Sequence, residues 1–329
     1  MRNCVNAELR NAPMPQSRNL PYHRSMHARP VTHLSGVLVA DFSRILAGPL
    51  CTMMLAEAGA RVIKVEEPDG DETRRWGPPF VEGESSYFLS VNRGKESIAL
   101  NLKLSGALDA ARRLVARADV VIENFRADHR EKFGLSAAQV HAINPKAVHC
   151  SIVGFESDGP DAGLPGYDLL AQAGAGLMSI TGDKAGDPMK AGVALSDVLT
   201  AHHAHGAILA ALFARARTGC GESIEVSLSG STVASLVNVA QAYLLTGDRP
   251  KRYGNEHPSI VPYQPFHASD RPFAVAAASD RQYESLCAQV LGRADLSGDA
   301  RYASNPARVK NRESLIATLE AIFATRRAD

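Results

Sequence analysis

The sequence lacks the features that mark several common classes of protein. Its five cysteines are scattered singly, with no CxxC pair and no histidine at zinc-finger spacing, so neither a disulfide framework nor a zinc site is expected. No apolar run reaches the roughly 18 to 20 residues that span a bilayer. The net charge of +1 provides no overall field to attract nucleic acid or an anionic membrane. We therefore expect a soluble protein with no metal, no nucleic-acid partner and no membrane association.

The N-terminal segment, residues 1–33, differs from the rest of the chain. It contains five arginines and three histidines but only one acid, Glu8, and it has no apolar periodicity. Such a composition cannot bury enough surface to fold, so we expect a disordered extension. The segment has no apolar region typical of a secretory signal, whereas its Arg-rich, acid-poor balance would suit a mitochondrial transit peptide. The cytoplasm is the expected compartment and the mitochondrial matrix the alternative; a true start at Met26 is equally plausible.

From Leu34 onward, short aliphatic runs alternate with helical patterns. Strands are predicted at residues 36–41, 61–66, 97–102, 119–123, 147–153 and 222–227, with helices between most of them. This alternation predicts an α/β fold whose large domain holds a Rossmann-like, mostly parallel sheet covered by helices on both faces. Such sheets bind ligands at the carboxyl ends of their strands, so the loops after Asp41, Glu66 and Glu123 are expected to form the site. No GxGxxG follows the first strand, which argues against a nicotinamide dehydrogenase.

The predicted domain boundaries follow composition. A large α/β domain is expected over residues 34–247, and a stretch rich in Gly, Pro and charge at 248–262 indicates a linker. A smaller α+β domain is expected over residues 263–329.

Several segments carry a more specific pattern. They are DFSRILAGPLCTMMLAEAGARVIKVE (41–66), TRRWGPPF (73–80), SVNRGKESIALNLK (90–103), DVVIENF (119–125), GYDLLAQAGAGLMSITG (166–182), GVALSD (192–197) and RYGNEHPSIVPYQPF (252–266). Together they resemble family III CoA-transferases, the CaiB/BaiF family, and among these the succinate/hydroxymethylglutarate-type and formyl-CoA transferases. The likeness runs from about Leu34 to the end. The family's chains continue for several dozen residues further, so the small domain is expected to be incomplete.

The resemblance implies that CoA passes from an acyl-CoA, such as succinyl-CoA, to a carboxylic acid. It implies an aspartyl anhydride and thioester intermediate, CoA as a substrate rather than a permanently bound cofactor, and an interlocked homodimer. The family's nucleophilic aspartate corresponds to Asp197, at the end of the GVALSD segment. Because Asp197 directly precedes a predicted helix at 198–217, it could also be an ordinary N-cap residue. The helix dipole is expected to keep its carboxylate ionised at neutral pH.

Asp168, in the GYD segment, is the second acid that the resemblance singles out. Transferases place an acid here beside the acyl group, and racemases of the same fold use the matching aspartate as a base, usually after a histidine. This chain has Tyr167 at that position. Racemisation needs an acid and a base around the α-carbon, so CoA transfer is favoured. A 2-methylacyl-CoA racemase and an inactive truncated fragment remain the alternatives, and Asp168 also suits a helix cap.

The remaining site residues follow from the resemblance and from side-chain chemistry. The CoA surface is implied to comprise Ile45, Leu46, Ala47, Leu100, Leu102, Lys103, Asn124, Phe125, Lys132 and Tyr167. Lysines suit its phosphates, and an aromatic ring suits its base. Because Glu67 stands where relatives often have a basic residue, the adenine contact is expected to weaken or to move to Lys64 or Arg74.

Two basic residues are predicted to contact the substrate acid. Arg44, after the first strand, suits a substrate carboxylate, and His257 lies in a segment whose counterpart in relatives approaches the acyl pocket. His202 and His205 share a helix face, but no third ligand follows them at suitable spacing, so they predict no metal site.

Overall fold

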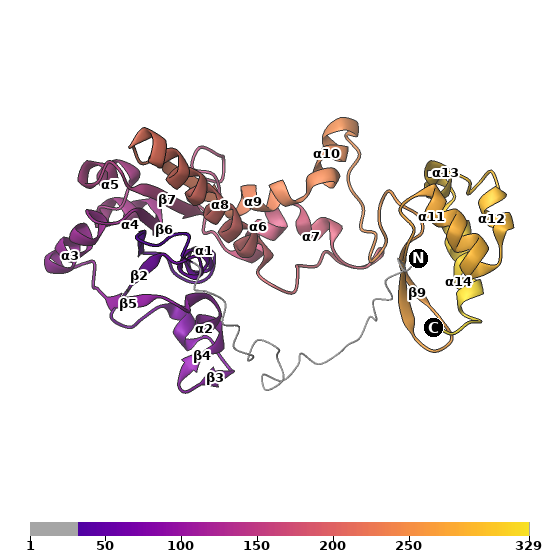
Figure 1. Ribbon diagram of the computed structural model, residues 1–329, viewed down its shortest axis with the longest axis horizontal. Helices are drawn as coiled ribbons and strands as arrows, with labels where there is room; N and C mark the ends of the chain where they lie inside the picture. The colour runs from indigo at the N-terminus through magenta and orange to yellow at the C-terminus, as the bar shows by residue number, and fades with distance from the viewer. Residues whose placement is uncertain (1–31, 329) are drawn as a thin grey trace. The chain divides into compact units, whose positions relative to one another are not determined.

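The computed structural model describes residues 32–328 of the chain. The predicted disordered extension, residues 1–33, lies almost wholly outside this range. The described residues form two compact units, drawn in Figure 1. The larger unit comprises residues 32–180 and 188–250, and the smaller unit comprises residues 181–187 and 251–328.

A six-stranded sheet forms the centre of the larger unit (Figure 1). Its strands, in spatial order, are β5 (Glu96–Ala99), β2 (Arg61–Glu66), β1 (Leu38–Asp41), β6 (Val120–Glu123), β7 (Val148–Val153) and β8 (Ser223–Ser227). Every neighbouring pair is parallel, with Val39 of β1 opposite Val62 of β2 and Val120 of β6. The central strands are aliphatic along their length because both faces of a parallel sheet are covered. The predicted α/β fold is confirmed.

Successive residues of the central strands pack on opposite faces of this sheet. Val39 and Ile122 pack on one face with α1 (Ala47–Glu57) and α8 (Leu195–Thr218). Ala40 and Val121 pack on the other face with α3 (Ser105–Val115) and α5 (Ala137–Ile143). Helices thus cover both faces, as the alternation of strands and helices predicts.

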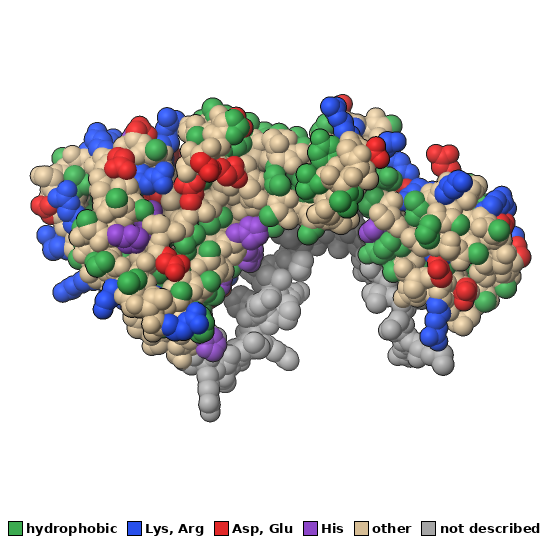
Figure 2. All heavy atoms as spheres, turned by 90° about the horizontal axis from the view of Figure 1, so that it is seen from above, with side chains coloured by type: hydrophobic (Ala, Val, Ile, Leu, Met, Phe, Trp, Pro, Cys, Tyr) green, Lys and Arg blue, Asp and Glu red, His purple; other side chains and the backbone are tan. Residues whose placement is uncertain are grey.

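Shorter elements complete the larger unit. They are η3 (Glu72–Arg75), β3 (Phe80–Val81), β4 (Glu84–Ser85), α2 (Ser86–Asn92), α4 (Ala127–Phe133), α6 (Asp168–Gly174), α7 (Leu177–Ile180), α9 (Leu228–Ser235) and α10 (Val237–Thr246). Hydrophobic side chains gather on the surface of α10 (Figure 2), where Leu244 and Leu245 are 75% and 76% exposed. No helix within residues 32–328 is long and apolar enough to cross a membrane.

The smaller unit combines a hairpin with a group of short helices. The hairpin pairs β9 (Tyr263–His267) with β10 (Pro272–Ala276), and it is followed by α11 (Asp280–Ser285), a π-helical turn η4 (Leu286–Leu291), α12 (Ala294–Gly298), α13 (Asn305–Lys310) and α14 (Arg312–Phe323). Arg308 is fully buried; its guanidinium donates to the Val261 carbonyl at 2.6 Å and pairs with Asp280 at 2.8 Å. These contacts fasten α13 to the start of α11 and to the segment that leads into β9. A buried charge stabilises a core only when it is paired in this way.

Candidate active site

Asp197 lies within the first turn of α8, not before the helix as the sequence predicts. The helix begins at Leu195, and its N-cap residue, Ala194, offers no side-chain hydrogen bond. The Asp168 side chain supplies the missing acceptor, because its Oδ1 accepts the backbone N–H of Ser196 at 2.9 Å. A carboxylate at this place satisfies an orphan N–H of the first turn, so the helix extends to Leu195 and includes Asp197.

Asp168 is itself oriented by its own helix. It is the first residue of α6, and its Oδ2 accepts the side-chain N–H of Gln172, one turn later, at 2.8 Å. The side-chain oxygen of Gln172, Oε1, accepts the backbone N–H of Ala191 at 2.8 Å. Asp168 therefore caps α8 and not the helix that it begins, because the N-cap residue of α6 is Tyr167 and that helix has no side-chain cap hydrogen bond. Neither Gln172 nor Ser196 was singled out from the sequence, because each gains its role through a contact with a distant segment.

The electrostatics of Asp197 differ from the sequence-based expectation. Burial is the largest influence and, together with the negative charge of Asp168, it raises the pKa of Asp197 to about 7. The backbone N–H of Ala47, at the start of α1, acts in the opposite direction and lowers this pKa. The expected full ionisation at neutral pH is wrong, because desolvation and a like charge outweigh the helix terminus. Asp197 is poised to exchange between its charged and neutral forms near neutrality.

The pKa of Tyr87 in α2 is also affected by these two acids. Burial raises the pKa of its phenol to about 12, and the charges of Asp197 and Asp168 add to the effect. Its ring meets Trp76 edge to face, with ring centres 5.1 Å apart. The sequence offers no signal for Tyr87, since it follows a turn and lies far from both acids along the chain.

The loop between β1 and α1 has an unusual backbone. Ile45 has a φ of +72°, a region that a β-branched residue avoids at a cost of about 1 to 3 kcal/mol. The two ends of the loop approach so closely that a Cβ on Gly48 would lie 2.2 Å from the Cβ of Ser43. Asn124, which follows β6, accepts the N–H of Arg44 at 3.0 Å and donates to its carbonyl at 2.9 Å. The loop is therefore held in one conformation by residues far away in sequence.

The residues predicted to bind CoA lie in the larger unit, most of them in loops after strands. Ile45, Leu46 and Ala47 follow β1, Leu100, Leu102 and Lys103 follow β5, and Asn124 and Phe125 follow β6. Carboxyl ends of parallel strands share one edge of the sheet, so the fold brings these loops to the same edge. Leu100, Leu102 and Phe125 are partly buried against one core cluster, whereas Lys103, Lys132 and Tyr167 are exposed.

Both residues proposed to replace the missing adenine contact form ion pairs within the larger unit. Lys64 is 2% exposed and lies 2.9 Å from Asp71, so no surface remains for a base. Arg74 pairs with Glu66 at 2.7 Å and with Glu84 at 3.0 Å. The burial of Lys64 contradicts its proposed contact with adenine, whereas a weakened contact and a contact through Arg74 stay predictions.

The predicted substrate residues have different settings. Arg44 is partly buried in the larger unit, with its side chain 41% exposed, and pairs with Glu72 at 3.2 Å. His257 belongs to the smaller unit, where its Nδ1 accepts the N–H of Ser259 at 3.0 Å. Arg312 fixes this segment by donating to the His257 carbonyl at 2.8 Å. Among residues 32–328, no group of three His, Cys, Asp or Glu residues could hold a metal ion.

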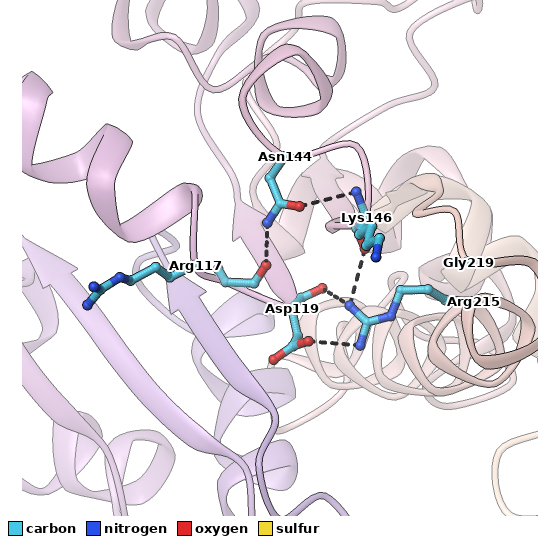
Figure 3. Close-up of a pocket in the computed structure, with 7 residues that line it drawn as sticks. Arg117, Asp119, Asn144, Lys146, Arg215 and Gly219 are labelled. Atoms are coloured by element: carbon cyan, nitrogen blue, oxygen red, sulfur yellow. Dashed lines mark hydrogen bonds and ion pairs between the residues drawn. The ribbon is translucent and has the colours of Figure 1, made fainter.

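A cavity of about 320 Å³ lies at the opposite edge of the sheet, beside the starts of β6 and β7 (Figure 3). Its polar side chains bind one another. Arg215 pairs with Asp119 at 2.9 Å and donates to the Lys146 carbonyl at 3.2 Å, and Asn144 donates to the Ala118 carbonyl at 2.9 Å. The contacts of Arg215 attach the end of α8 to the segments before β6 and β7. Because these groups are already paired, we do not consider the cavity a candidate reaction site.

Comparison with known proteins identifies the family. The model described as CoA-transferase family III matches residues 34–329. This chain belongs to CoA-transferase family III. A solved CaiB/BaiF family protein from Brucella suis has a similar structure, with a TM-score of 0.78 and 45% sequence identity over 90% of this chain and 79% of that one.

Curated family III relatives agree with the assignment. A succinyl-CoA:glutarate CoA-transferase of Mus musculus is 44% identical over 292 residues, which cover 88% of this chain and 67% of the relative. A succinate–glutarate CoA-transferase of Agrobacterium fabrum is 46% identical, covering 85% of this chain and 71% of the relative. Both relatives are named as CoA-transferases, so the predicted enzyme class is confirmed and the racemase alternative is not favoured.

Proposed function

We propose that this chain transfers CoA from a short dicarboxylyl-CoA, such as succinyl-CoA, to a carboxylic acid, with Asp197 as the nucleophile. The proposal rests above all on the Asp197 carboxyl group, which is partly buried in the first turn of α8 and whose pKa is raised to about 7 by burial and by the charge of Asp168. The names of the relatives support succinyl-CoA as the donor. CoA is then a substrate and not a resident cofactor.

The Asp197 carboxylate is sufficient for every covalent step of the transfer. The Asp197 carboxylate attacks the thioester carbonyl, the carbon–sulfur bond breaks, and CoA leaves as a thiolate while a mixed anhydride forms. The thiolate then attacks the aspartyl carbonyl, which releases the donor acid as its carboxylate and leaves an enzyme thioester. The acceptor carboxylate repeats these steps in reverse order, so that Asp197 is regenerated and a new acyl-CoA departs. No net proton transfer is required.

The surroundings of Asp197 suit these steps. Partial burial removes water from the anion and from the anhydride, which would otherwise hydrolyse. The backbone N–H of Ala47 lowers the pKa of Asp197 and so favours its carboxylate form. Asp168 holds the first turn of α8 through Ser196, which fixes the direction from which Asp197 attacks.

Mass spectrometry tests this function directly. The full chain is incubated with succinyl-CoA, glutaryl-CoA, formyl-CoA and acetyl-CoA in turn, digested, and searched for a covalent CoA or acyl adduct. We expect an adduct on the peptide that contains Asp197. An adduct elsewhere, or none with any donor, would contradict the proposal.

Arg44 provides a test of the dicarboxylate preference. A second carboxylate on the substrate needs a cation, and the Arg44 side chain, which belongs to the loop between β1 and α1, is 41% exposed. We expect succinyl-CoA to be a better donor than acetyl-CoA, and Arg44→Ala to reduce that preference by roughly 1 to 3 kcal/mol, the scale of a charge-assisted hydrogen bond. The measurement is kcat/KM for the two donors, with Arg75→Ala, an exposed arginine of η3, as control. An unchanged ratio in Arg44→Ala would assign the second carboxylate to another group, such as His257.

We also propose that the chain forms the interlocked homodimer that the resemblance implies. The exposed leucines of α10 support it, because apolar side chains gathered on one helix favour burial against a partner. Light scattering at micromolar concentration is expected to give twice the mass of one chain, and Leu244→Glu combined with Leu245→Glu to reduce that mass. A wild-type monomer would contradict the dimer.

We also propose a cellular compartment for the protein. Cys51, Cys150, Cys220 and Cys287 are all free thiols. Free thiols are typical of a reducing compartment, so the cytoplasm is favoured, with the mitochondrial matrix as the alternative.

A further inference from the structure

Gln172 of α6 is a buried residue whose side-chain amide has different partners at its two ends. The residue is 0% exposed. Its Oε1 accepts the backbone N–H of Ala191 at 2.8 Å, and its Nε2 donates to Asp168 Oδ2 at 2.8 Å. The same nitrogen lies 3.5 Å from the carbonyl oxygen of Val193. One side chain therefore connects α6 to the segment 191–193, which leads into α8.

Only one orientation of this amide satisfies its partners. The Ala191 N–H is a donor and requires the amide oxygen, whereas the Asp168 oxygen is an acceptor and requires the amide nitrogen. A flipped amide would place donor against donor and acceptor against acceptor in a buried site, where unmade hydrogen bonds are costly. A glutamate of the same length lacks the donor, and a leucine lacks both groups. The two contacts together therefore require an amide at position 172.

Asp168 carries this restraint to the helix that contains Asp197. While Gln172 holds Oδ2 of Asp168, Oδ1 accepts the backbone N–H of Ser196 at 2.9 Å. Ser196 directly precedes Asp197 in the first turn of α8, whose own N-cap residue supplies no side-chain hydrogen bond. A contact at 2.7 Å between the hydroxyls of Ser196 and Thr232 fixes the serine side chain but leaves its N–H dependent on Asp168. Without Gln172, the Asp168 carboxylate could rotate and leave this turn uncapped.

We propose that Gln172 is a positioning residue for the reaction of Asp197, which holds the Asp168 carboxylate on the Ser196 N–H and thereby fixes the first turn of α8. Gln172 acts through Asp168 and has no contact with the reacting atoms in this role. The consequence for catalysis rests on the proposed function of Asp197. The hydrogen bonds do not depend on turnover, so the two are measured separately.

Hydrogen exchange of the full chain at single-residue resolution measures the hydrogen bonds without substrate. In Gln172→Leu, we expect the N–H groups of Ala191 and Ser196 to exchange about tenfold faster, since one loses its acceptor and the other loses the group that orients its acceptor. In Gln172→Glu, Ala191 keeps an acceptor. Only Ser196 should then lose protection, because the new carboxylate repels that of Asp168.

The rate of adduct formation at Asp197 with succinyl-CoA, followed by rapid-quench mass spectrometry, measures the catalytic consequence. Rates are compared at pH 9, above the Asp197 pKa of about 7, so that an added charge at position 172 does not decide the result. We expect Gln172→Leu and Gln172→Glu each to lower the rate about tenfold to a hundredfold, the scale found for a displaced reacting group.

Gln139→Leu is the matched control. The Gln139 side chain also acts at a helix start, where its oxygen accepts the N–H of Ser136 at 3.1 Å before α5. This helix packs on the opposite face of the sheet from α8. Gln139→Leu should therefore change neither the exchange of Ser196 nor the rate of adduct formation.

An exchange of the two side chains tests whether Gln172 acts through Asp168. The double variant Asp168→Asn, Gln172→Glu again places a donor opposite an acceptor, with the direction of the hydrogen bond reversed. We expect Ser196 to regain its protection, and Gln172→Glu to cost at most about twofold in rate when Asp168→Asn is present. A role of Gln172 in packing alone would give the same loss in both backgrounds.

Three results would overturn the inference. The first is unchanged exchange of Ser196 in Gln172→Leu and Gln172→Glu chains whose thermal unfolding shows that they are folded. The second is an unchanged adduct rate in these variants, and the third is an equal loss with and without Asp168→Asn. If Gln172→Leu does not fold, Gln172→Glu and the double variant are judged by the same criteria. A wild-type chain that shows the expected exchange but forms no adduct with any acyl-CoA would contradict the proposed function and leave the hold of Gln172 on Ser196 standing.

Discussion

Asp197→Ala is expected to abolish CoA transfer, with a loss of about four orders of magnitude or more in kcat, the scale found when a covalent nucleophile is removed. Alanine offers no oxygen to form the anhydride, and Asp168, the acid whose charge acts on Asp197, is engaged with Ser196 and Gln172. CoA binding should stay within a few-fold of wild type, because the loops predicted to bind CoA follow β1, β5 and β6. The measurements are turnover with succinyl-CoA and glutarate, and CoA affinity by calorimetry.

Two further variants test whether the loss of activity could have a cause other than the missing carboxylate. Asp197→Asn keeps the size of the side chain and should be as inactive as alanine while it unfolds at a similar temperature. Asp161→Ala removes an exposed aspartate of the same unit and should keep full activity. Turnover retained in Asp197→Asn, without deamidation by mass spectrometry, would remove Asp197 from the mechanism.

The rate of adduct formation should depend steeply on pH. Only the anion of Asp197 attacks a thioester, and the pKa of this group is raised to about 7. The rate is therefore highest above that pH and falls about tenfold per unit below it, to about one hundredth of its maximum at pH 5. An unperturbed aspartate, with a pKa near 4, would show almost no change over this range. Rapid-quench mass spectrometry of the first turnover between pH 5 and 9 measures the profile.

Asp168→Asn tests the cause of that profile. Its negative charge raises the pKa of Asp197, so its removal should move the midpoint of the profile to lower pH. The asparagine oxygen can still accept the N–H of Ser196, which keeps the start of α8 in place. Asp69→Asn, an exposed aspartate elsewhere in the unit, is the control. A midpoint that stays at about 7 in Asp168→Asn would assign the shift to burial alone.

The strands of the six-stranded sheet were predictable to within a few residues because their signals are local. Aliphatic runs bounded by turn residues located β2 at its observed ends and the other strands of this sheet to within three residues, whereas the short strands β3 and β4 were not predicted. The start of α8 was missed because its first turn is capped by Asp168, 28 residues earlier in the chain. When the capping side chain comes from a distant segment, the sequence at the start of the helix carries no capping signal.

By itself, the sequence determined the α/β architecture, because alternating periodicity is a property of neighbouring residues. It also predicted the edge of the sheet where ligands gather and, through the resemblance to family III, Asp197 as the acid to examine. Only the tertiary structure decided the chemical state of that acid. The pKa of Asp197 depends on burial, on the charge of Asp168 and on the N–H of Ala47, and these three come together only when α1, α6 and α8 pack. The strained Ile45 turn and the contacts of Gln172 with Asp168 and Ala191 were likewise invisible in the sequence, since a backbone dihedral angle and the partners of a buried amide are set by the tertiary contacts around them.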